Sequence, residues 1–79
     1  MNYITYEEMV HKCNDIEIEI IRSIKLHRKE AKIYNVYVSV GDEDEGTYFI
    51  DVEIGGSPET YNRWYGYYTL PRLKRIFKF

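Results

Sequence analysis

The sequence lacks the features that are typical of a secreted or membrane protein. Cys13 is the one cysteine among 79 residues, so no internal disulfide can form, which fits a reducing cytoplasm. No apolar run approaches the length of about 18 residues that a membrane span needs. The first residues lack a basic stretch followed by an apolar one, so we expect no signal peptide and a cytoplasmic protein without a membrane segment.

Catalytic motifs are also missing. The chain has no phosphate-binding loop, dinucleotide fingerprint, zinc-ligand spacing or serine nucleophile motif. Glu8 and His11, like His27 and Glu30, have the spacing of metal-bridging pairs, but a bundle site needs such pairs from several helices. Cys13 and His11 point to different sides of a helix, so they form no nucleophile–base pair. We therefore expect no enzyme, no cofactor and no bound metal.

Composition predicts one small domain spanning residues 1–79. The hydrophobic fraction of 44% and the charged fraction of 30% are those of an ordinary globular chain. A chain this short buries a thin core. Ten isoleucines, one alanine and no glutamine suggest an AT-rich coding sequence, as in many phages and low-GC bacteria.

The net charge of −2 hides four blocks of alternating sign. Residues 1–21 carry five acids and one lysine, and residues 22–32 carry five bases and one acid. Residues 33–60 then carry seven acids and no base, whereas residues 61–79 carry five bases and no acid. Segregated charge of this kind creates strong local fields despite the small total.

The start of the chain predicts a long helix over residues 6–30. Thr5 and Glu8 have the spacing of a capping box, and Ile4 and Met9 stand at the positions of a hydrophobic staple. Apolar residues then recur at helical spacing. An alternative stays open, because Asp15 to Ile20 alternates apolar and polar residues as a strand does; a short helix would then break at Asn14-Asp15.

Two alternating segments predict a β-hairpin. They place four apolar side chains each on one face: Tyr34, Val36, Val38 and Val40, then Tyr48, Ile50, Val52 and Ile54. The loop between them is Gly41 to Gly46. Because both apolar sets must share a face, we expect Val38 opposite Tyr48, Val36 opposite Ile50, and Tyr37 opposite Phe49 on the other face.

The last third of the chain predicts a strand and a short helix. Gly55 to Pro58 forms a turn, and Tyr61 to Thr69 is rich in β-forming residues. Pro71 then suits the first turn of a C-terminal helix. The fold class is therefore α+β in the order α-β-β-β-α, with a long N-terminal helix packed on a three-stranded antiparallel sheet and a short C-terminal helix.

The aromatic run is the main candidate for a binding surface. Five of the eight residues from Tyr61 to Tyr68 are aromatic, too many for a core this small. Tyrosine and tryptophan are enriched at binding hot spots, and they also stack on the bases of single-stranded nucleic acid. We expect one face of this strand in the core and the other exposed. The candidate residues here are Tyr61, Arg63, Trp64, Tyr65, Tyr67 and Tyr68.

The hairpin loop is the second candidate. Asp42, Glu43, Asp44 and Glu45 are consecutive acids, which suit a solvated hairpin tip, a calcium loop or a mimic of nucleic-acid phosphates. A calcium loop needs alternating acids, a central glycine and about 12 residues, so this loop is too short. Phosphate mimicry against a basic groove and a simple solvated tip remain as interpretations.

A basic cluster in the C-terminal helix supports an alternative nucleic-acid site made by Arg63, Arg72, Lys74, Arg75 and Lys78. The α-β-β-β-α order resembles that of the double-stranded-RNA-binding domain, and Arg72, Lys74 and Arg75 stand where that family's second helix grips phosphates. In that family the first hairpin loop enters a minor groove. Here the loop carries four acids, which phosphates would repel.

The sequence thus favours a non-enzymatic protein-binding module. Its concrete form is a small inhibitor or adaptor, of the kind phages and mobile elements encode, that blocks a host nucleic-acid enzyme. The acidic hairpin would lie against a basic groove and the aromatic strand would anchor it. Nucleic-acid binding is one alternative, disfavoured by the net charge of −2. A homodimer that pairs edge strands and buries the aromatic face against itself is the other.

Overall fold

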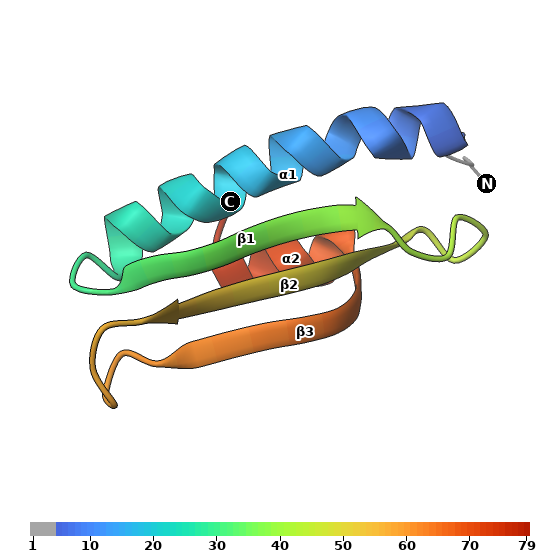
Figure 1. Ribbon diagram of the computed structural model, residues 1–79. Helices are drawn as coiled ribbons and strands as arrows, with labels where there is room; N and C mark the ends of the chain where they lie inside the picture. Colours follow the sequence, from blue (N-terminus) through green and yellow to red (C-terminus); the bar gives the residue numbers. More distant parts are fainter. Residues whose placement is uncertain (1–4) are drawn as a thin grey trace.

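A computed structural model describes residues 5–79. The chain forms a helix, a three-stranded antiparallel sheet and a second short helix, so the α+β class and the α-β-β-β-α order are confirmed (Figure 1). The elements are α1 (Tyr6–His27), β1 (Lys32–Val40), β2 (Thr47–Gly55), β3 (Asn62–Thr69) and α2 (Leu70–Phe77).

Helix α1 begins as its capping signal predicts. The side chain of Thr5 accepts a hydrogen bond from the Glu8 backbone N–H at 3.2 Å. The predicted staple involves Ile4, which lies outside the described residues. The helix ends at His27 rather than residue 30, because Arg28 leaves helical geometry and the chain turns toward β1.

The segment from Asp15 to Ile20 is helical, so the alternative of a break and a strand is wrong. Ile16 and Ile20 are buried four residues apart, whereas Ile18 between them is half exposed. Helical spacing puts Ile16 and Ile20 on one face and Ile18 outside it. The alternation in the sequence therefore reflects a single isoleucine on the outer surface of the helix.

The register of the hairpin differs from the predicted one by two residues. Val38 pairs with Ile50 and Val36 pairs with Val52, whereas Tyr48 lies opposite Val40. Tyr37 accordingly lies opposite Asp51, and not opposite Phe49. A shift of two keeps every side chain on its face, so the apolar faces still coincide.

The loop explains this register. Thr47 closes it, since its backbone carbonyl accepts the Gly41 N–H at 3.0 Å and its hydroxyl accepts the Asp42 N–H at 2.8 Å. The Asp42 carboxylate in turn accepts the N–H of Asp44 at 2.9 Å. These local bonds extend the strand pairing to Gly41 and leave a tight acidic turn at the tip.

Strand β1 also contains a bulge at Tyr34. The pairing of Ile33 with Ile54 is followed directly by that of Asn35 with Glu53, so Tyr34 has no partner on β2. The prediction that Tyr34 shares the face of Val36 is therefore wrong. Its side chain is 57% exposed.

Both helices lie on the same face of the sheet, where they enclose the core. Pro71 lies in the first turn of α2, as predicted, and Leu73 and Phe77 anchor this helix. The Ser23 hydroxyl on α1 donates a hydrogen bond to the Phe77 carbonyl and so joins the two helices. The buried apolar residues are Met9, Cys13, Ile16, Ile20, Ile24, Val38, Tyr48, Ile50, Val52, Ile54, Leu73 and Phe77.

Candidate functional site

Among residues 5–79, no helix covers the second face of the sheet (Figure 1). In a strand, alternate side chains point to opposite faces, so the residues between the core positions project outward in three cross-strand rows. We call these nine residues the open face. They are Asn35, Glu53 and Arg63; Tyr37, Asp51 and Tyr65; and Ser39, Phe49 and Tyr67.

The open face contains a cluster of aromatic rings around Phe49. The ring centroids of Tyr65, Tyr67 and Tyr37 lie 5.1, 5.4 and 6.5 Å from that of Phe49, all in edge-to-face geometry. Phe49 itself is partly buried, whereas Tyr65 is 62% and Tyr67 is 65% exposed. Tyr65 and Tyr67 thus pack against Phe49 and still present most of their surface to solvent.

Two further tyrosines extend this cluster at the other end of the sheet. The bulge allows the ring of Tyr34 to lie over Gly55, and its hydroxyl accepts the Gly56 N–H at 3.0 Å. Tyr61 donates a hydrogen bond to the Glu53 carboxylate at 3.0 Å, which raises the pKa of Tyr61. Both rings are more than half exposed.

Arg63 is the only base on the open face, and its charge is already paired. Its Nε and Nη2 atoms donate to the two carboxylate oxygens of Asp51, each at 3.1 Å. The guanidinium also lies 4.9 Å from the ring centroid of Tyr65. The contact with Asp51 raises the pKa of Arg63. This residue therefore links the ring cluster to the acidic part of the face and offers little free positive charge.

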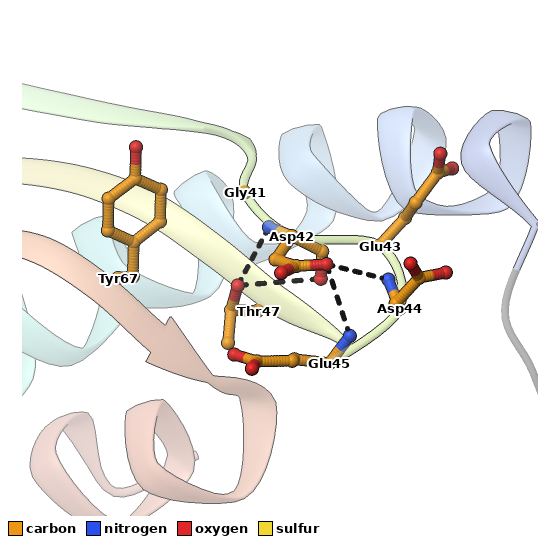
Figure 2. A pocket seen from close by; sticks show the side chains of 7 residues that line it. All are labelled: Gly41, Asp42, Glu43, Asp44, Glu45, Thr47 and Tyr67. Carbon is orange, nitrogen blue, oxygen red and sulfur yellow. Dashed lines mark hydrogen bonds between the residues drawn. The ribbon is translucent and has the colours of Figure 1, made fainter.

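The acidic loop adjoins Tyr67, as Figure 2 shows. Gly41, Thr47, Tyr67 and the four acids from Asp42 to Glu45 line an open hollow of about 610 Å³. The carboxylate of Asp42 is occupied by backbone N–H groups, whereas the carboxylates of Glu43, Asp44 and Glu45 are exposed around the turn. Negative charge thus stands directly beside the exposed rings.

The structure divides the sequence-predicted aromatic strand between its two faces, as expected. Tyr61, Arg63, Tyr65 and Tyr67 are exposed on the side of the open face. Trp64 and Tyr68 instead lie on the helix-covered face and are partly buried against the core.

Both of these inner rings have neighbours on the helices. Trp64 lies 4.9 Å from Phe77 of α2 and 5.1 Å from the guanidinium of Arg28, and Tyr68 lies 4.6 Å from that of Arg72. The predicted partner-binding residues therefore do not form a single surface.

The basic residues of the C-terminal helix lie on the side of the sheet away from the open face. Arg72, Lys74, Arg75 and Lys78 are all exposed there, because Leu73 and Phe77 turn the apolar side of α2 to the core. Arg63, the fifth residue of the predicted nucleic-acid site, lies across the sheet from them. Exposed rings and free bases are therefore on opposite sides of the molecule.

No group of three or more histidine, cysteine, aspartate or glutamate side chains lies close enough to hold a metal ion within residues 5–79. None of the helices in these residues has both the length and the apolar character needed to cross a bilayer.

Three residues of the aromatic surface were not among the sequence-predicted candidates: Tyr34, Tyr37 and Phe49. Alternation indicates that Tyr37 and Phe49 point to the face of the sheet opposite Val36 and Val38, so the sequence could predict on which face they lie. The contact of Phe49 with Tyr65 and Tyr67 depends on the pairing of β2 with β3, which alternation does not give. Tyr34 joins the surface only because of the bulge.

Comparisons with protein-family models, with curated proteins and with solved structures gave no match.

Proposed function

We propose that this protein is a non-catalytic module that binds another protein through its open face and acidic loop. The observation that carries the proposal is the cluster of exposed aromatic rings on the sheet face that the helices leave uncovered. Rigid rings of this kind provide large contact area at low entropic cost and dominate many protein interfaces. Contiguous exposed apolar surface marks interaction sites in small proteins.

The charge around the rings favours a basic partner. Asp51 and Glu53 lie within the open face and Asp42 to Glu45 lie beside it, whereas Arg63 is the one base and is paired with Asp51. Such a surface attracts positive potential on a partner and repels phosphates. The separation of the rings from the free bases of α2 also weighs against the nucleic-acid alternative.

The concrete form of this proposal is an inhibitor or adaptor of an enzyme that acts on DNA or RNA. The nucleic-acid groove of such an enzyme is basic because it must hold phosphates. The acidic loop would occupy that groove, and Tyr65 and Tyr67 would bind apolar surface at its rim. The composition, which suggests an AT-rich coding sequence as in many phages and low-GC bacteria, is compatible with this role.

A panel of purified DNA and RNA polymerases and nucleases tests this proposal by inhibition and direct binding at two salt concentrations. We expect the protein to inhibit at least one of them, more strongly at low salt. The isosteric variant Asp42→Asn/Glu43→Gln/Asp44→Asn/Glu45→Gln should weaken that binding by about tenfold or more. Tyr65→Ala/Tyr67→Ala should also weaken it, because these rings are the proposed anchors.

A matched control removes the same number of charges elsewhere. Glu7, Glu8, Asp15 and Glu30 are exposed and belong to the α1 side, so their amide variant should bind like the wild type. If both amide variants lost binding equally, net charge alone would explain it and the proposed surface would be wrong. Fluorescence anisotropy with labelled single- and double-stranded DNA and RNA completes the test, since tight, salt-sensitive binding there would favour the nucleic-acid alternative.

A further inference from the structure

The two edges of the sheet differ in how they are protected from pairing with another strand. On β1 the bulge at Tyr34 interrupts the edge, and the carboxylate of Glu17 on α1 accepts the outward-facing N–H of Val38 at 2.9 Å. Bulges and charged side chains at edges are the usual devices that prevent association of sheets. The edge of β1 is therefore blocked.

Strand β3 is less protected along its length from Asn62 to Thr69, although the side chain of Asn62 occupies the outward N–H of Arg63 at 2.9 Å. It pairs with β2 without interruption, contains no proline and carries one charge, that of Arg63. Figure 1 shows β3 as the outermost strand, with α2 behind the sheet and not across this edge. The edge of β3 is thus open to pairing at Tyr65 and Tyr67, with Gly66 between them in an unusual backbone geometry of φ 144°.

The hydrogen-bond alternation identifies which groups of β3 point outward. In an antiparallel sheet, every second residue directs its N–H and C=O away from its neighbouring strand. The Arg63 N–H bonds the side chain of Asn62 at 2.9 Å, which indicates that Arg63 belongs to the outward set. Tyr65 and Tyr67 follow at intervals of two, so their backbone groups face the free edge.

We propose that two copies of this chain pair antiparallel along β3, with Tyr65 opposite Tyr65 of the second copy, to form a six-stranded sheet. In this register Trp64 lies opposite Gly66, so a large side chain meets a position without one. Arg63, which stays paired with Asp51, lies opposite Tyr67 of the second copy, so its side chain packs beside that ring. Both pairs occur twice because the arrangement has twofold symmetry.

Charge supports the same arrangement. Tyr67 lines the hollow at the acidic loop, and the antiparallel pairing keeps the two acidic loops at opposite ends of the dimer, so they do not repel each other. The open faces of both copies stay uncovered and become continuous, so this dimer stands apart from the proposed function.

Cysteine cross-linking tests the register. Residues directly opposite in a hydrogen-bonded antiparallel pair have Cα atoms about 5.5 Å apart, within the range of a disulfide. Tyr65→Cys should therefore form a linked dimer under mild oxidation. Tyr37→Cys is the matched control, since Tyr37 is an exposed tyrosine on the same face but on β1. The native Cys13 is buried and should not react.

Sedimentation equilibrium tests the dimer itself. The wild type should change from monomer to dimer with rising concentration, and the emission of Trp64 should shift with it. Tyr65→Lys and Tyr65→Glu should each weaken dimerisation by about tenfold or more, because like charges would face each other, and an equal mixture of the two should restore a dimer. A monomer at every concentration would overturn the proposal. So would equal linking of Tyr37→Cys and Tyr65→Cys, which would indicate sheets stacked face to face.

Discussion

The substitution Tyr48→Phe should stabilise the protein. Tyr48 is 1% exposed in the centre of the core, and its hydroxyl is the one buried side-chain polar atom without a hydrogen-bond partner among residues 5–79. A buried hydroxyl that lost its bonds to water and gained none in the fold costs about 1–3 kcal/mol. Phenylalanine keeps the ring and its packing and removes only that oxygen.

The expected gain is therefore about 1 kcal/mol or more in the free energy of unfolding, measured by urea denaturation. In a domain of this size, 1 kcal/mol corresponds to a shift of about 4–8 °C in the melting temperature. Tyr37→Phe is the matched control, because it removes the same atom from a side chain that is 49% exposed, and should change stability little. A loss of stability in Tyr48→Phe of about 1 kcal/mol would refute the reasoning, since the hydroxyl must then have a partner.

Three smaller predictions concern pH, a close contact and the helix cap. Burial raises the pKa of the Cys13 thiol and of the Tyr48 hydroxyl, so at high pH the folded state keeps protons that the unfolded chain releases. The free energy of unfolding, measured by urea denaturation, should therefore be constant below about pH 8 and fall toward about pH 11. The fall should be smaller in the variant Cys13→Ala/Tyr48→Phe. Gly55→Ala should destabilise, because its Cβ would stand 2.5 Å from the Tyr34 ring; a double-mutant cycle should show that Tyr34→Ala removes most of this cost. Thr5→Ala should cost about 1 kcal/mol in thermal unfolding, and no change would mean that the cap contributes nothing.

Local signals predicted the elements of this fold well. The start of α1 follows from Thr5 and its bond to the Glu8 N–H, and Pro71 marks the start of α2. The two hairpin strands follow from alternation, because one face had to be apolar. Each of these signals lies within a few residues of the structure it determines.

The hairpin register and the bulge could not be predicted in this way. The alternation of Val36 and Val38 is satisfied equally by registers that differ by two residues. The side chains of Asp42 and Thr47 decide between them by closing the loop, and the bulge at Tyr34 moves one ring to the other side. Both depend on geometry that hydrophobic pattern does not contain.

The candidate surface was predicted only in part, again because the hydrophobic pattern does not show how the strands pair. Alternation separates Tyr65 and Tyr67 from Trp64 and Tyr68, but both sets are aromatic, so the pattern does not say which set is covered. The pairing of Trp64 with Val52 decides it, because Val52 already belongs to the core. Only this long-range pairing brings Phe49 between Tyr37 and the tyrosines of β3.

Under the proposed function, the open face is a surface kept for binding, and not simply a face that the chain is too short to cover. Antiparallel sheets with one solvated face normally alternate apolar residues inside with polar residues outside. β1 and β2 follow this rule on most of their outer positions, whereas β3 places Tyr65 and Tyr67 there beside Phe49. Serine or threonine would suit a solvated strand at these positions equally well and would not expose apolar area.

Exposed rings promote aggregation unless something limits it, and the adjacent carboxylates of the acidic loop provide such a limit through repulsion between copies stacked face to face. The same repulsion does not oppose edge pairing along β3, which keeps the two acidic loops at opposite ends. The arrangement of charge therefore favours a dimer joined at its edge with both aromatic faces free for a basic partner.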